Sequence, residues 1–247
     1  MSSIDINADL GEGDLHDAEL LSIVSSCNIA CGGHAGDVDS MRATVKAALA
    51  NGVAIGAHPS YPDKQGFGRR SGFRGTNLRD SLVSQIGALE DVVAEQGARM
   101  GHVKPHGALY NDAAVDARLA ETVAEAILEA AGEVQLVGPP GSELQRAAER
   151  HGLGFLGEAF IDRAYLANGR LVPRTETGAV HGSLEKILAQ AVSLAKRRSV
   201  MSIDGKRITI CADTLCVHGD TPGAADAARA VRAELQKQGI EIRGAAE

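Results

Sequence analysis

The chain has 247 residues, with 25 Lys or Arg against 32 Asp or Glu, so its formal net charge is −7. This acidic balance, with only three Tyr, four Phe and no Trp, argues against a nucleic-acid-binding surface, which is usually basic and often stacks aromatic rings on bases. No apolar run approaches the roughly 20 residues of a membrane span, and the N-terminus has no basic or apolar signal region. We therefore expect a cytoplasmic protein with no nucleic-acid or membrane partner, whose four cysteines are reduced thiols.

Short apolar runs alternate with helical patterns along the chain. The predicted strands cover residues 4–10, 27–31, 53–57, 100–104, 134–137, 154–160 and 207–212. The predicted helices cover residues 14–24, 38–52, 76–97, 119–127, 142–151, 184–194 and 228–235. Asp37 is a plausible N-cap of the second helix, and Gly52 closes it. About seven β-α units indicate right-handed crossovers and a parallel sheet.

The two faces of these strands favour a barrel over an open sheet. In the first strand, Asp5, Asn7 and Asp9 share one face and apolar side chains share the other, and the strand that contains His102 also has a polar face. A doubly wound sheet, covered by helices on both faces, would have continuous apolar strands instead. We therefore expect one α/β domain over residues 1–247, a distorted, seven-stranded, TIM-like (β/α) barrel whose polar lumen is a candidate site.

Reactive side chains stand at or just past the carboxyl ends of six strands, where barrel enzymes build active sites. The candidate site residues are Asn7, Asp9, Glu12, His34, His58, Asp63, Arg69, Arg70, His102, Lys104, His106, Glu158, Arg163, Asp213 and His218. His102 is equally consistent with a hydrogen-bonded interior histidine. The arginine-rich run 66–75 is either a solvated surface or a lid that binds a carboxylate or phosphate. The sequence has no P-loop, dinucleotide-binding glycine motif or Gly-x-Ser-x-Gly elbow.

Six runs of sequence, in order along nearly the whole chain, carry a resemblance to a known family. They are NADLGE at 7–12, ACGGHAGD at 30–37, GAHPSYPDKQGFGRR at 56–70, HVKPHGALYN at 102–111, EAFIDRAY at 158–165 and TLCVHGD at 214–220. In these runs the chain resembles the LamB/YcsF family. That family usually has Cys near Ala8, Phe at Gly33 and Pro at Val38, and these departures leave His34 and His58 in place.

The resemblance implies a seven-stranded barrel of the glycoside hydrolase/deacetylase type that acts as the A subunit of a 5-oxoprolinase. With subunits B and C, it would open the lactam of 5-oxo-L-proline to L-glutamate, coupled to hydrolysis of ATP to ADP and phosphate. Phosphorylation of the amide oxygen would activate the carbonyl for attack by water. Lys104, Arg69 and Arg70 suit the phosphate and the substrate carboxylate in that scheme. The implied catalytic set, which activates water or relays protons, is Asp9, His58, Lys104 and His106.

Two other interpretations remain open at this stage. A metal-dependent deacetylase or amidohydrolase acting alone could hold a divalent metal such as Mg²⁺ on Asp9, His58 and His106. A non-catalytic subunit would instead bind the lactam and present it to its partners. Metal content separates the first alternative from the 5-oxoprolinase interpretation, and site variants that change affinity but not the chemical step would indicate the second. The sequence is also compatible with a homo-oligomer.

Overall fold

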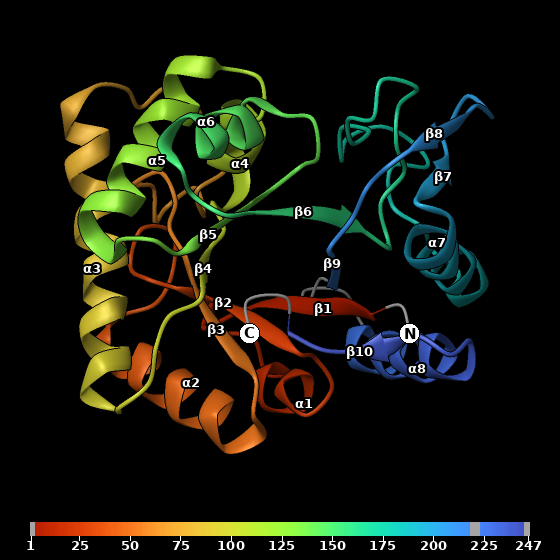
Figure 1. Cartoon of the computed structure of the whole chain (residues 1–247), viewed down its shortest axis with the longest axis horizontal. Helices are drawn as coiled ribbons and strands as arrows, with labels where there is room; N and C mark the ends of the chain where they lie inside the picture. Colours follow the sequence, from red (N-terminus) through yellow and green to blue (C-terminus); the bar gives the residue numbers. More distant parts are fainter. Residues whose placement is uncertain (1–2, 218–222, 245–247) are drawn as a thin grey trace.

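Seven parallel strands form a closed barrel within the part of the chain that the structure, a computed structural model, describes, residues 3–217 and 223–244 (Figure 1). In order around the barrel they are β1 (Ser3–Leu10), β2 (Ser26–Ala30), β3 (Ala54–His58), β4 (His102–Val103), β5 (Gln135–Gly138), β6 (Phe155–Phe160) and β9 (Thr214–Val217). β9 pairs with both β6 and β1, which closes the barrel. The predicted fold is confirmed.

Helices surround the barrel and cover the apolar faces of its strands. They are α1 (Asp17–Leu21), α2 (Val38–Asn51), α3 (Thr76–Glu95), α4 (Gly107–Ala113), α5 (Ala117–Ala131), α6 (Glu143–His151), α7 (Leu184–Arg197) and α8 (Ala224–Lys237). α3 packs against α2 and α5, and α7 packs against α8. Ile6 and Leu10 of β1 are fully buried in the resulting core, as expected for a strand with one apolar face. None of the described helices is long and apolar enough to cross a membrane.

The prediction that residues 207–212 form the last barrel strand is wrong. Residues 207–209 form β8 (Arg207–Thr209), which pairs antiparallel with β7 (Ser199–Met201) in a separate two-stranded sheet. The barrel strand is the next segment, β9, and β10 (Glu241–Ile242) adds to β1 at its amino end. Residues 207–212 alternate apolar and polar side chains as a strand should, and this pattern does not tell a surface hairpin from a barrel strand.

Caps and turns set the other boundaries. Asp37 Oδ1 accepts a hydrogen bond from the backbone N–H of Ser40 at 2.8 Å, and the Asp37 N–H donates to Ser40 Oγ at 2.8 Å. This reciprocal pair is a capping box, so the predicted role of Asp37 as a helix cap is confirmed. α1 is shorter than the predicted helix at 14–24. β4 is shorter than the predicted strand at 100–104, although the Lys104 N–H still donates to the carbonyl of Ala57 in β3 at 2.9 Å.

Polar side chains fill the lower part of the barrel lumen. Asp5 Oδ2 accepts from Ser26 Oγ at 2.6 Å and from Thr214 Oγ1 at 2.5 Å. His102 crosses the lumen toward Gly56, where an added Cβ would lie 2.2 Å from His102 Nε2, so the absence of a side chain at this position makes room for the ring. No space large enough for a water molecule is left in this layer. The polar lumen predicted from the strand faces is therefore a packed hydrogen-bonded network.

Candidate active site

A cavity of about 480 Å³ lies at the carboxyl ends of the barrel strands. Its walls come from β1, β3, β4 and β6 and from the segments that follow them, including the start of α4. The predicted residues that line it are Asp9, Glu12, His58, Arg69, Lys104, His106 and Arg163. Barrel enzymes place their active sites at this end of the fold, so the cavity is the candidate active site.

The ammonium of Lys104 lies between two carboxylates at the floor of the cavity. Its Nζ donates to Asp9 Oδ1 at 2.9 Å and to Glu158 Oε1 at 2.7 Å, and it contacts Asn7 Oδ1 at 3.3 Å. Burial alone would lower the pKa of Lys104, but the negative charges of Asp9 and Glu158 hold that pKa well above its usual value. An ammonium has three donors, so these contacts suit a role in keeping Asp9 ionised better than the expected contact with a phosphate.

His58 and His106 face each other, and the backbone fixes the outer nitrogen of each ring. His58 Nδ1 lies 2.7 Å from the carbonyl oxygen of Lys104, and His106 Nε2 lies 3.0 Å from that of Phe67. A carbonyl oxygen only accepts hydrogen bonds, so both of these nitrogens carry hydrogen. Two neutral rings would therefore point the lone pairs of His58 Nε2 and His106 Nδ1 at each other across 3.0 Å. One additional proton, or a cation, satisfies both nitrogens.

Two carboxylates flank this pair of imidazoles. Asp9 Oδ2 lies 3.3 Å from His58 Nε2, and Glu12 Oε1 lies 3.2 Å from His106 Nδ1 and 2.8 Å from His34 Nε2. Burial would raise the pKa of Glu12, but hydrogen bonds from His106 and His34 and the charge of His58 lower it to about 2. Burial would lower the pKa of His58, but the charge of Asp9 and its hydrogen bond raise it. The surroundings of His58 therefore favour its protonated form.

Four side chains at the same place form a group that could hold a metal ion. Glu12, His34, His58 and His106 each offer one ligand atom, and these atoms lie within 4.8 Å of one another. Burial is the main cause that lowers the pKa of His34 to about 4, so its imidazole is neutral, as a metal ligand must be. Imidazole donors suit Zn²⁺ and other transition metals better than Mg²⁺, which prefers oxygen. Compared with the set predicted from the sequence, the group has Glu12 and His34 in place of Asp9.

Three predicted binding residues lie below the cavity and are not part of its lining. Asn7 Nδ2 donates to Glu158 Oε1 at 3.1 Å, and His102 Nε2 lies 2.9 Å from Asn28 Oδ1. All three are buried, and their partners are other residues of the lumen. Glu158 nevertheless reaches the cavity floor through Lys104. The structure thus places Asn7, His102 and Glu158 beneath the floor of the cavity.

The remaining predicted residues have other positions. Asp63 Oδ1 accepts from the backbone N–H of Gly66 at 2.9 Å and lies 3.9 Å from an Arg70 nitrogen, so this pair folds the segment after β3. Asp213 was expected to follow a barrel strand. It instead precedes β9, at the opposite end of the barrel from the cavity. There its Oδ2 accepts from the N–H of Gly157 at 2.9 Å. His218 lies outside the described residues.

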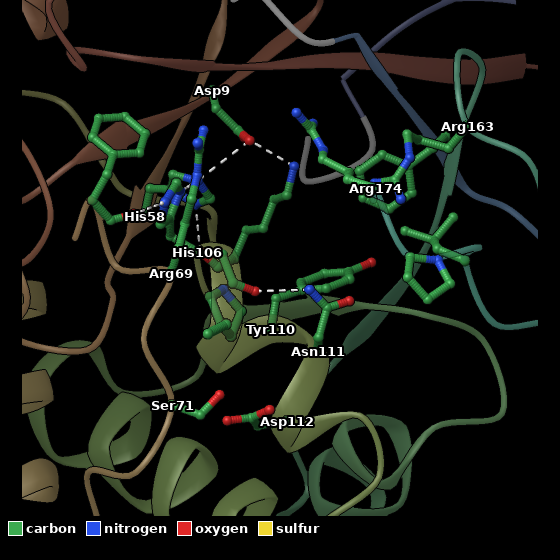
Figure 2. A pocket seen from close by; sticks show the side chains of 18 of the residues that line it. Asp9, His58, Arg69, Ser71, His106, Tyr110, Asn111, Asp112, Arg163 and Arg174 are labelled. Atoms are coloured by element: carbon green, nitrogen blue, oxygen red, sulfur yellow. Dashed lines mark hydrogen bonds and ion pairs between the residues drawn. The ribbon is translucent and has the colours of Figure 1, made fainter. Parts of the chain in front are cut away.

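Several residues that line the cavity were not predicted from the sequence. Tyr110 and Asn111 come from α4, and Arg174 comes from the segment between β6 and α7 (Figure 2). Arg170 comes from the same segment. Tyr110 and Asn111 belong to the run at 102–111, so the motif itself was the signal for them. Arg170 and Arg174 stand well past the end of β6 in a stretch with no strand or helix pattern. Only the way in which this segment folds back brings them to the cavity.

We expect the protein to lose stability as the pH falls below 6.5. Burial lowers the pKa of His102 and of His34 to about 4 in the folded state, whereas an unfolded histidine has its usual pKa of about 6.5. The unfolded state therefore binds more protons between these values, and each histidine reduces the free energy of unfolding by up to about 1.4 kcal/mol per pH unit. Glu12, with its pKa lowered to about 2, adds a further loss below pH 4.5.

Thermal melts at pH 7 and pH 5 measure this loss. His58, whose pKa is raised, acts in the opposite direction, so the decline measured is the net of the two effects. His102→Gln should show a shallower decline between the two pH values than the wild-type protein, because glutamine does not titrate. Equal slopes for the two proteins would contradict the buried, neutral state of His102.

Comparison with known proteins gives the family of the chain. The LamB/YcsF family model matches residues 4–247. The crystal structure of a lactam utilization protein from Thermus thermophilus is 39% identical, with a TM-score of 0.92 over 98% of this chain and 99% of that one. A T48 deacetylase with substrate (11% identity, TM-score 0.51, 98% and 87% of the chains) and a GH113 β-1,4-mannanase complex (10%, 0.53, 96% and 99%) share the fold alone. The chain therefore belongs to the LamB/YcsF family.

Proposed function

We propose that this chain is the A subunit of an ATP-dependent 5-oxoprolinase, which opens the lactam of 5-oxo-L-proline to L-glutamate together with subunits B and C. Membership of the LamB/YcsF family and the likeness to a lactam utilization protein support the substrate class. The observation that carries the proposal is the position of His58 at the cavity floor, where its Nε2 lies 3.3 Å from Asp9 Oδ2 and 3.0 Å from His106 Nδ1. A group of this kind can exchange protons with an amide during hydrolysis.

The proton transfers of the reaction follow from the two forms of His58. Hydrolysis of a lactam adds water to the carbonyl carbon, breaks the C–N bond and leaves a carboxylate and an amine. In its neutral form, His58 Nε2 can accept a proton from the attacking water, and in its charged form it can give a proton to the departing nitrogen. Asp9, kept ionised by Lys104, stabilises the charged form. His58 Nδ1 remains on the Lys104 carbonyl throughout and fixes the orientation of the ring.

Coupling to ATP removes the main difficulty of the reaction, the poor leaving group of an amide. Transfer of the terminal phosphoryl group of ATP to the amide oxygen would release ADP and make the carbonyl carbon more reactive toward water. A first water would then break the C–N bond and leave an acyl phosphate, and a second water would release phosphate and the carboxylate. Of the two adjacent arginines suggested by the sequence for anion binding, Arg69 lines the cavity and lies 5.1 Å from the centre of the Phe67 ring. Arg70 lies near Asp63 and is not part of the cavity lining. We therefore assign a role in anion binding to Arg69 and not to Arg70.

Reconstitution tests this function directly. Glutamate formation from 5-oxoproline and ATP is measured with the B and C subunits, with and without this chain. Product that appears only when the chain is present, with one ADP formed for each glutamate, is the expected result. If B and C form glutamate equally well without the chain, the assignment of this chain to the complex is wrong. If the complete mixture forms ADP but no glutamate, the assigned substrate is wrong.

A second candidate function is metal-dependent hydrolysis of an amide by the chain alone. It is favoured by the facing lone pairs of His58 and His106, which a cation satisfies as well as a proton does, and by Glu12 beside them. A bound divalent metal would supply polarisation of the amide carbonyl and a more acidic water. The two backbone carbonyls on the outer nitrogens would fix both tautomers, as partners of metal-bound histidines commonly do.

Cobalt substitution distinguishes this candidate from the first. The purified chain is stripped with a chelator and titrated with Co²⁺, whose visible absorption reports imidazole ligation without any assay of activity. One equivalent of bound Co²⁺, lost in Glu12→Gln, together with amide hydrolysis in the absence of B and C, would establish the second function. A chain that takes up no Co²⁺ would exclude it and leave the proton-only network.

A further inference from the structure

Three arginines of one segment border the cavity on a single side. The segment, residues 162–183 between β6 and α7, contributes Arg163, Arg170 and Arg174 to the cavity lining. It folds back on itself through isolated bridges that pair Arg163 with Val180 and residue 165 with residue 171. The turn between the second pair uses Gly169, whose φ of 83° suits a residue without a side chain. This turn places Arg170 where the segment begins to run back, and Arg170 lines the cavity.

Arg163 is the fixed member of the group. It is only 7% exposed, and its guanidinium donates from Nη2 to the carbonyl of Val172 at 2.6 Å and from Nε to that of Ala179 at 3.3 Å. The other terminal nitrogen of the guanidinium, Nη1, takes no part in these two hydrogen bonds. Burial first, and then the positive charge of Arg174, lower the pKa of Arg163, and the negative charge of Asp162 opposes them. Two guanidinium groups therefore lie close enough to repel each other in one wall.

The arginine-bearing segment and the two imidazoles border the cavity from different sides. Figure 2 shows Arg163 and Arg174 on one side of the cavity and His58 and His106 on the other, with Asp9 between the two groups. Asp9 is already bonded to Lys104 and lies against His58. An arginine wall facing a cavity is a ready site for an oxyanion, because guanidinium forks match both carboxylate and phosphate oxygens.

We propose that Arg163, Arg170 and Arg174 form an oxyanion subsite, which holds a carboxylate or phosphoryl group of a molecule whose reacting amide lies against Asp9 and His58. The proposal rests on the proposed ring-opening function and adds the residues that recognise the charged part of its reactants. The oxyanion has two possible sources, the carboxylate of 5-oxoproline and the phosphoryl group of ATP. Arg163 orients the subsite from within the wall, and the exposed Arg170 and Arg174 complete it from the rim.

Calorimetric titration of the chain alone tests the subsite. The three probes are 5-oxoproline, 2-pyrrolidinone, which is the same ring without the carboxylate, and inorganic phosphate. Arg170→Gln and Arg174→Gln should each weaken binding of at least one oxyanion by roughly tenfold, the lower end for a hydrogen bond to a charged group, and leave 2-pyrrolidinone unaffected. Loss confined to 5-oxoproline identifies its carboxylate as the oxyanion, and loss confined to phosphate identifies the phosphoryl group.

Arg118→Gln is the matched control, because Arg118 is exposed on α5 outside the cavity and its replacement changes the net charge equally. The proposal is overturned if neither oxyanion binds the wild-type chain, or if both bind Arg170→Gln and Arg174→Gln as tightly as Arg118→Gln. Arg163 is left intact, because its bonds to Val172 and Ala179 support the segment. Since these titrations need no turnover, a failure of the proposed function in reconstitution would remain distinct from a failure of the subsite.

Discussion

Asp9→Asn should reduce the rate of ring opening by roughly 10²- to 10⁴-fold, the range that positioned acid–base groups usually contribute. The carboxylate of Asp9 lies 3.3 Å from His58 Nε2 and is the main cause that opposes burial and raises the pKa of His58. An amide at this position has nearly the same shape but no charge. The protonated form of His58, from which we propose that a proton passes to the departing nitrogen, would then lose the charge that favours it. The measurement is kcat for glutamate formation by the reconstituted complex.

Asp14→Asn provides the control for this variant. Asp14 also lines the cavity but is exposed, and its replacement causes the same change in net charge. We expect it to alter kcat by less than Asp9→Asn by at least an order of magnitude, because surface charges contribute little. The pH profile provides a second readout, since the loss in Asp9→Asn should be smallest at low pH, where His58 is protonated even without its partner. Equal kcat values for Asp9→Asn and the wild-type protein would remove Asp9 from the mechanism.

Lys104→Met should lower the free energy of unfolding by about 3–5 kcal/mol, the usual effect of removing one partner from a buried ion pair. Lys104 is only 2% exposed and contacts both Asp9 and Glu158, so its loss removes the one ammonium that these two carboxylates share. For a chain of this length, each kcal/mol corresponds to about 2–4 °C in Tm, so a decrease on the order of 10 °C is expected. Thermal unfolding at pH 7 measures it.

The double variant Lys104→Met/Glu158→Gln identifies the cause of that loss. If unpaired carboxylates are responsible, neutralising Glu158 should restore part of the stability, and the two substitutions should not be additive. A double variant that is less stable than Lys104→Met by the full effect of Glu158→Gln alone would show that packing, and not charge, is lost. Raising the ionic strength should change either result little, because buried pairs are only weakly screened by salt.

The alternation of polar and apolar residues along the strands allowed the barrel and its polar lumen to be predicted from the sequence. Asp5, Asn7 and Asp9 alternate with apolar residues in β1, and this period of two is a direct consequence of strand geometry. The positions of Asp9, His58 and His106 followed in turn, because parallel strands bring their carboxyl ends to one rim. Local sequence therefore determined which side chains meet at the floor of the cavity.

The features that the sequence did not reveal depend on long-range packing. Residues 207–212 alternate as a strand should, and only their pairing with β7 places them outside the barrel and Asp213 at its opposite end. The cavity wall formed by Arg170 and Arg174 depends on how an irregular segment turns at Gly169, which no periodic pattern encodes. The facing lone pairs of His58 and His106 follow from two backbone carbonyls that are distant in sequence from the rings they contact. The carbonyl of Lys104, after β4, contacts His58, and the carbonyl of Phe67, after β3, contacts His106.

The filled lower lumen has a kinetic consequence. Because the polar network beneath Lys104 leaves no room for water, no passage leads through the described part of the barrel, and molecules enter and leave the cavity through its mouth. In the proposed reaction, glutamate would therefore depart along the route by which 5-oxoproline arrives, and we expect it to act as a competitive inhibitor. A partner protein seated over that opening would convert the cavity into a closed reaction chamber, in which an activated intermediate is retained until water has attacked it.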